Sequence, residues 1–275
     1  MATSYFRSTF RSAVCAVLVF APMVGAQNIS AIQARFLADR LTYGAQPADI
    51  AAITGPILNY RLWLRDQLDP DLSGAPGSDD PLLLSIVQAA TPSTQTPPAN
   101  FLDGATWKQL SMARVARATL TQWQVNEVMT QFWEQHFNVN GATARDILVG
   151  QRRYRREHGE HVAAYHEWTL HEFYRQNALG DFADLIANTT VAPTMMLYLN
   201  MVDARDCGSP NQNYARELLE LFTMGQLFRP VGGGQPTLNY TQDDIEELAR
   251  ALTGWDLNPP PAMAPAFTDA SILIT

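Results

Sequence analysis

Four polar residues near position 213 have the types and the spacing to act together. They share one arc of a helical wheel drawn at about 100° per residue, and they are Asn213, Arg216, Glu217 and Glu220. The apolar residues that fill the rest of the wheel are Tyr214, Leu218, Leu219, Leu221 and Phe222. The polar arc suits a ligand site or a buried polar network. The alternative is a solvated face, on which Arg216 and Glu220 form an i,i+4 pair worth about half a kcal/mol or less.

His136 is the candidate partner of this arc. It falls on the apolar face of a helix predicted from about Val125 to Asn138, which Gly141 is expected to stop, so the imidazole is expected to face inward. One interpretation is a general base in a pocket formed with the 213 helix. A hydrolase or metal-dependent enzyme would then use His136, Glu217 and Glu220 as its candidate catalytic residues. The other interpretation is a buried neutral imidazole that is hydrogen-bonded to backbone.

The histidines raise the question of a metal site, because all five occur within one short region. They are His136, His158, His161, His166 and His171. The zinc-protease pattern needs two histidines four residues apart, but His166 and His171 are five apart and point about 140° away from each other on a helix. The chain also lacks the glycine pattern of a nucleophile elbow. We assign no metal, and the cofactor stays unknown.

The elements that position these residues are predicted to be helices with clear ends. Ser30 begins a capping box, and Gly44 ends the helix that follows it. Gly225 ends the 213 helix, and Thr241 caps a last helix that stops at Gly254. The buried stripe of that last helix consists of Ile245, Leu248, Ala249 and Leu252.

The remaining segments support the same fold class. Pro193 breaks the apolar stretch from Phe182 to Leu199 after Val191. A basic amphipathic helix from Thr106 to Trp123 carries Arg117 on what we interpret as a solvated face. No β alternation of useful length occurs. We predict an all-α protein, an irregular multi-helix bundle with long Pro/Gly-rich connections.

The first 26 residues have the pattern of a secretory signal peptide. Arg7 and Arg11 precede an apolar run from Ala13 to Val24, and small residues end at Ala26. We expect cleavage near Ala26 and a periplasmic or secreted protein. No later segment reaches the roughly 20 apolar residues of a membrane span. Cys207 is then the only cysteine, so no internal disulfide can form.

The charge of the mature chain excludes one class of partner. The formal net charge of −8 becomes −10 when the two arginines of the signal are removed, with 17 basic against 27 acidic residues. Nucleic acid repels such a chain, so we expect no nucleic-acid partner. We expect residues 27–255 to form one helical domain, and residues 256–275 to be a Pro-rich, irregular tail.

Several motifs occur in a fixed order along the chain. They are Arg35-Phe-Leu37 with Tyr43-Gly44, Trp63 to Gln67, Phe132-Trp133 with His136-Phe137, Asn177 to Phe182, Ala192 to Met195 with Tyr198-Leu199, Asn213 to Gly225, and Tyr240 to Trp255. Together they resemble the bacterial domain-of-unknown-function family 1800, over roughly residues 30 to 255. The chain departs from the family at Glu134, where a histidine is usual. It also ends soon after the Thr-Gly-Trp motif, as an N-terminal, truncated member would.

The resemblance implies an exported, predominantly helical protein without an established activity. Family members are often encoded beside a sulfatase-like secreted protein. The function is therefore unknown, and whether the chain is an enzyme stays open. We favour an interaction or scaffold partner of a co-exported sulfatase-like enzyme over the enzyme built on His136. A third hypothesis is a carbohydrate binder, since Trp107, Trp123, Trp133 and Trp168 could stack on sugars.

Overall fold

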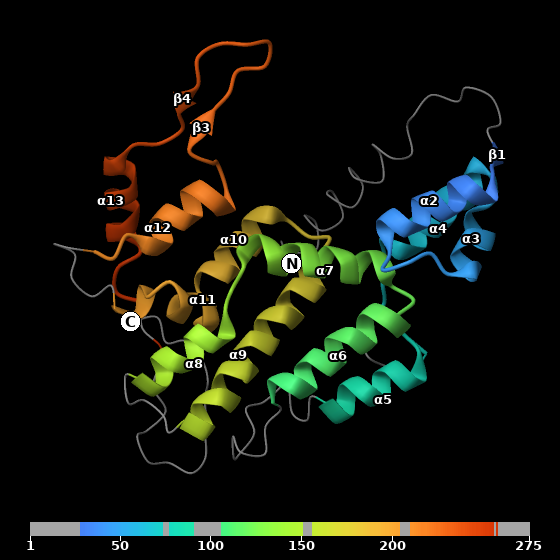
Figure 1. The fold of residues 1–275 in the computed structure, drawn as a ribbon, viewed down its shortest axis with the longest axis horizontal. Coiled ribbons are helices and arrows are strands. Elements are labelled where there is room, and N and C mark those ends of the chain that lie inside the picture. Colours follow the sequence, from blue (N-terminus) through green and yellow to red (C-terminus); the bar gives the residue numbers. More distant parts are fainter. Residues whose placement is uncertain are drawn as a thin grey trace, which may run out of the picture. The chain divides into compact units, whose positions relative to one another are not determined.

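The computed structural model describes residues 28–73, 77–90, 106–150, 156–203, 210–255 and 257. Helices dominate this part of the chain, and its strands form two short antiparallel pairs (Figure 1). The predicted all-α class is confirmed. The segment predicted to be a signal peptide, Cys207 and the tail from residue 258 lie outside the described residues.

The chain divides into two compact units, each assembled from separate stretches of sequence. Within the described residues, unit 1 takes in 28–90, 108–133 and 171–185. Unit 2 takes in 106–107, 134–170, 186–203, 210–255 and 257. Because the chain passes from one unit to the other within helices, the helices labelled α6, α7, α9 and α10 contribute residues to both.

Unit 1 is built around the first helices. Its elements are β1 (Asn28–Ile29), α2 (Ala31–Leu41), α3 (Pro47–Ile53), β2 (Gly55–Pro56), α4 (Ile57–Gln67), α5 (Pro81–Ala90), and parts of α6 (Trp107–Leu120), α7 (Gln124–Phe137), α9 (Arg156–Asn177) and α10 (Phe182–Thr190). The two strands pair with Ile29 opposite Gly55. One apolar cluster joins α2, α3, α4 and the start of α7, and its buried members are Ile29, Ala34, Ala38, Ile53, Trp63, Leu64 and Val125.

The first predicted cap is confirmed. The Gln33 backbone N–H donates to Ser30 Oγ at 3.3 Å, and the Ser30 N–H donates to Gln33 Oε1 at 2.9 Å. The helix ends at Leu41, and Gly44 follows in the left-handed region with φ +145°. Local sequence therefore sets both ends of α2, since a reciprocal cap and a permissive glycine act without tertiary help.

Unit 2 contains every residue of the predicted site. Its elements are the remaining parts of the shared helices, α8 (Gly141–Gly150), α11 (Pro193–Tyr198), η2 (Met201–Asp203), α12 (Asn213–Glu217), the π-helix η3 (Leu218–Phe222), β3 (Leu227–Phe228), β4 (Thr237–Leu238) and α13 (Gln242–Ala251). The break at Pro193 is confirmed, since it opens α11. The predicted capping box of α13 is also present, with Thr241 N–H donating to Asp244 Oδ2 at 2.7 Å.

The buried stripe of α13 follows the prediction. Ile245 and Ala249 are buried, and Leu248 and Leu252 pack against them beside Ala215 and Tyr240. The helix ends at Ala251, and Gly254 follows with φ +98°.

Gly141 has a different place from the one expected for it. We expected it to stop the preceding helix, but α7 ends at Phe137, where Asn138 takes φ +41°, and Gly141 begins α8. A Cβ at this position would lie 1.9 Å from Glu167 Oε2. That same oxygen accepts a hydrogen bond from Trp107 Nε1 at 2.9 Å. Gly141 is therefore a site of close approach to α9.

We expect Gly141→Ala to lower the free energy of unfolding by about 1–3 kcal/mol, because the methyl group displaces the Glu167 carboxylate from Trp107. Urea unfolding measures the loss. Gly150→Ala is the matched control in the same helix, since no heavy atom lies within 4 Å of its added methyl. Alanine is the better helix former, so the control should be neutral or stabilising by up to about 1 kcal/mol. Equal effects at both positions would contradict this role of Gly141.

Candidate functional site

The four residues of the predicted arc differ in their exposure. Asn213 and Arg216 are exposed, whereas Glu217 and Glu220 are partly buried. The Arg216 guanidinium reaches the side chains of Gln212 at 3.5 Å and Gln242 at 3.2 Å. These contacts tie α12 to α13, which is a different role from the ion pair with Glu220 considered above.

Glu220, the second carboxylate of the arc, accepts a hydrogen bond from a tyrosine. The Tyr240 hydroxyl donates to Glu220 Oε2 at 3.4 Å. Burial of the hydroxyl raises the pKa of Tyr240 above its ordinary value, and the charges of Glu220 and Glu217 raise it further, because an anionic tyrosine beside carboxylates is repelled. Tyr240 is therefore a hydrogen-bond donor at neutral pH, and it links Glu220 to the segment that leads into α13.

His136 contacts the end of the same helical segment. Its Nε2 lies 3.0 Å from the carbonyl oxygen of Phe222. A carbonyl only accepts, so Nε2 carries the hydrogen in this contact, and Nδ1 is the basic nitrogen of the neutral ring. The ring also packs edge-on against Phe137 with centroids 4.9 Å apart. This geometry matches the interpretation of an imidazole that is bonded to backbone.

A change of helix type decides which side chains reach this contact. The segment is α-helical to Glu217 and π-helical from Leu218 to Phe222. The wheel at 100° per residue placed both Leu221 and Phe222 on the apolar side. In the structure Phe222 is 4% exposed and Leu221 is 63% exposed. A π turn contains one more residue than an α turn, so a wheel drawn for an α-helix puts Leu221 on the wrong side.

Tyr214 fixes the start of this segment to α10. The Thr190 hydroxyl donates to the carbonyl of Ile186 at 2.8 Å, so the Tyr214 hydroxyl is the donor in its 2.7 Å contact with Thr190 Oγ1. Burial raises the pKa of Tyr214 to about 12. Its hydroxyl keeps its proton at any physiological pH, which makes the contact a structural one.

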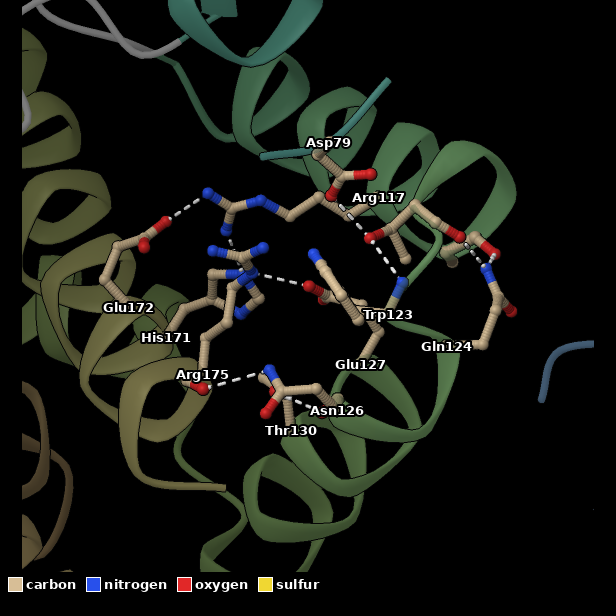
Figure 2. Close-up of polar contacts among 12 residues, drawn as sticks. Asp79, Arg117, Trp123, Gln124, Asn126, Glu127, Thr130, His171, Glu172 and Arg175 are labelled. Carbon is tan, nitrogen blue, oxygen red and sulfur yellow. Dashed lines mark hydrogen bonds and ion pairs between the residues drawn. The ribbon is translucent and has the colours of Figure 1, made fainter. Parts of the chain in front are cut away.

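A second cluster of polar groups is buried in unit 1, and its core is an ion pair between two helices. Arg175 of α9 donates from Nε to Glu127 Oε1 of α7 at 2.5 Å, with both side chains nearly inaccessible to solvent (Figure 2). Beside it, Asn126 Nδ2 donates to the Arg175 carbonyl at 3.0 Å. Thr130 donates to the Asn126 carbonyl at 2.8 Å. The buried face of α7 in unit 1 is therefore largely polar.

Arg117 of α6 completes this cluster, which corrects the prediction of a solvated face. Its side chain is buried, with Nη2 2.6 Å from Glu172 Oε1 and Nη1 2.9 Å from His171 Nε2. Guanidinium can only donate, so His171 Nε2 accepts and the imidazole proton is on Nδ1. Figure 2 shows these groups converging from α6, α7 and α9.

Burial and charge oppose each other in this cluster. Burial lowers the pKa of Arg117, although Glu172 acts in the other direction. For Glu172, burial alone raises the pKa, but the positive charges of Arg117 and Arg175 and the hydrogen bond from Arg117 lower it below its ordinary value. Two guanidinium groups thus face two carboxylates, and the charges balance. A balanced, dry cluster is suited to hold helices together, since it leaves no carboxylate for acid–base work.

Asp79 anchors the segment before α5 to the same region of unit 1. Its carboxylate accepts from the Thr121 hydroxyl at 2.6 Å and from the Gln122 backbone N–H at 3.1 Å. The neighbouring Ser78 carbonyl accepts from Trp123 Nε1 at 2.9 Å. Trp123 thus uses its polar edge for structure, as buried tryptophans commonly do.

Sequence reasoning missed this cluster because Glu127, Arg175 and Arg117 are far apart along the chain. One signal was available, since Asn126, Glu127 and Thr130 fall within one arc of the α7 helical wheel. Helical periodicity alone does not distinguish a buried polar arc from a solvated one. The reason it is buried is the guanidinium that α9 supplies from 48 residues away.

The described histidines do not gather into a metal site. Within the described residues, no three His, Cys, Asp or Glu side chains converge in a way that could hold a metal ion; the side chain of His158 lies outside them. His171 contacts Arg117, and burial lowers the pKa of His166 to about 4.

None of the helices in the described part of the chain combines the length and apolar character that a membrane crossing needs.

The comparison with protein families gives a match over most of the chain. A family model described as "Protein of unknown function (DUF1800)" matches residues 36–271. The chain belongs to this family. The match continues 16 residues beyond Trp255, so it takes in most of the Pro-rich tail. No curated protein and no solved structure gave a match. Membership of DUF1800 confirms the resemblance, and the function of the family is unknown.

The buried pair of this DUF1800 protein allows a test by double substitution. We expect Arg175→Leu to cost about 3–5 kcal/mol of unfolding free energy, because Glu127 is then a buried charge without its guanidinium. Adding Glu127→Leu should recover much of that loss, since two apolar side chains carry no desolvation penalty. Urea unfolding of the single and double variants gives the coupling. Additive losses would mean that the two charges do not stabilise each other.

The low pKa of His166 predicts an acid-sensitive fold for this DUF1800 protein. The folded ring stays neutral down to about pH 4, whereas the unfolded ring takes up a proton below its ordinary value of 6.5. Stability is therefore lost as the pH falls from 6.5 to 4, by up to about 3 kcal/mol. His166→Asn should reduce that pH dependence in denaturant titrations. An unchanged slope between pH 6.5 and 4 would contradict the assignment.

Proposed function

We propose that this protein is an interaction partner of another exported protein, most simply the sulfatase-like enzyme that is often encoded beside family members. One observation carries the proposal, namely a concentration of exposed apolar side chains between η3 and the end of the β3–β4 hairpin. We call it the hairpin patch, and it consists of Leu221, Met224, Leu227, Phe228, Val231 and Leu238, each at least 43% exposed. Monomeric proteins rarely expose several large apolar side chains together without a binding role.

The polar candidates support a binding protein better than an enzyme. His136 donates to the Phe222 carbonyl, and Glu220 accepts from Tyr240. These contacts hold helical segments in place. In unit 1 the carboxylates of Glu127 and Glu172 face guanidinium groups. Each of these four side chains therefore has a structural partner, whereas the hairpin patch faces solvent.

A second candidate function has a specific observation in its favour. π-helical turns are frequent at functional sites, and η3 carries Glu220 next to Glu217 while its last carbonyl meets His136. A hydrolase or metal-dependent enzyme would use His136 Nδ1 as the base. We rank it second because His136 contacts the Phe222 carbonyl whereas Glu220 contacts Tyr240, so the two side chains are directed to different parts of unit 2. The polar arc with Asn213 and Arg216 then serves as a ligand site or as the network between α12 and α13.

We also propose where the protein acts. The segment 1–26 directs export and is removed near Ala26, so residues 27–255 work as the helical domain in the periplasm or outside the cell. The excess of acidic over basic residues opposes binding to nucleic acid.

Co-purification from native cells tests the interaction proposal. The tagged full-length protein is expected to elute above its monomer mass, together with a second exported protein at a constant ratio. His136→Gln is the control, since an amide can also donate to the Phe222 carbonyl and the complex should persist. Elution of the protein alone, at the monomer mass, would reject the proposal.

A further inference from the structure

His171 is a titratable side chain inside the charged cluster of unit 1. The residue is 3% exposed, and its Nε2 accepts a hydrogen bond from Arg117 Nη1 at 2.9 Å. A guanidinium has only donors, so Nε2 must offer it a lone pair. This contact between α9 and α6 therefore exists only while the ring is neutral.

Charged side chains from three helices lie around this contact (Figure 2). Arg117 comes from α6 and Glu127 from α7, while Glu172 and Arg175 come from α9 itself. Glu172 pairs with Arg117, and Glu127 pairs with Arg175. Each carboxylate thus already has a guanidinium partner, and the four charges cancel as long as the His171 ring is neutral.

A proton on Nε2 of His171 opposes this arrangement in two ways. The Nε2–H and the Arg117 N–H are then two donors that face each other 2.9 Å apart. The ring also adds a third positive charge to a buried cluster, where an unmatched charge is costly. Arg114, one turn before Arg117 on α6, is positive too, and the Asp79 carboxylate is already hydrogen-bonded to the turn between α6 and α7.

We propose that His171 is an acid-sensitive switch in unit 1, which holds α6 on α9 while its ring is neutral and releases α6 when the ring takes up a proton. A solvated histidine ring takes up a proton near about pH 6.5, whereas in the closed form the same nitrogen is occupied by Arg117. The open form therefore binds protons more readily, and acid favours it. The switch does not depend on the hairpin patch, whose residues belong to unit 2.

Hydrogen exchange on the full-length protein, followed by mass spectrometry, tests the switch. Backbone protection is compared at about pH 8 and about pH 5, the range in which histidine changes charge, after correction for intrinsic exchange rates. Amides of α6 are expected to lose at least about tenfold in protection at the lower pH relative to amides of α2, whose packing is apolar. Equal protection of α6 at both pH values, or an equal loss in α2 and α6, would overturn the proposal.

Two variants separate His171 from another histidine of α9. His171→Gln keeps an acceptor for Arg117, since the amide Oε1 replaces Nε2, but it takes up no proton. The protection of α6 in this variant is expected to be the same at both pH values. His166→Asn is the matched control, because His166 belongs to unit 2, and it should keep the loss seen in the wild type. Acid release of α6 that persists in His171→Gln, or that disappears in His166→Asn, would contradict the switch.

Nitrogen NMR of the histidine rings in the wild-type protein gives an independent measurement, which stays decisive if His171→Gln does not fold. At neutral pH the His171 ring is expected to carry its proton on Nδ1. Its Nε2 resonance should change to that of a protonated ring over the same pH range in which α6 loses protection. A proton on Nε2 at neutral pH, or a ring that stays neutral while α6 is released, would refute the proposal.

Discussion

Unit 1 depends on a buried contact between opposite charges. Arg175 and Glu127 join α9 to α7, and Arg117 and Glu172 join α6 to α9, with every side chain except that of Glu172 less than 10% exposed. A buried ion needs its partner at a fixed distance, because desolvation costs several kcal/mol for each ion that is not matched. Apolar packing tolerates small shifts, whereas these pairs do not. They therefore fix which faces of the three helices meet.

Unit 2 is held in another way. Its segment from residue 213 to 251 uses an apolar stripe on α13, a π turn that directs Phe222 inward, and single hydrogen bonds made by Tyr214 and His136. Tyr214 and His136 join this segment to α10 and α7, and Arg216 joins α12 to α13. These contacts fit a supporting role for the segment that carries the hairpin patch.

The ion pairs of unit 1 and the hydrogen bonds of unit 2 support the same interpretation of function. The titratable groups that sequence patterns single out as chemical mostly have structural partners, and the hairpin patch combines a rigid base with apolar side chains that face water. A protein that binds another protein needs both properties, since rigidity reduces the cost of association and apolar area drives it. Membership of DUF1800 is compatible with this function without assigning it.

The sequence by itself determined the helical class, the caps at Ser30 and Thr241, the break at Pro193 and the apolar stripe of α13, because each depends on residues within a few positions of one another. Only the tertiary structure decided whether Arg117, Glu127 and Leu221 are buried or exposed. The first two are buried because α9 supplies their partners from about 50 residues away, and Leu221 is exposed because a π turn shifts the register of the helix. Helical periodicity shows which side of a helix is polar. A charged side chain on that side is buried only where another helix supplies a group of opposite charge.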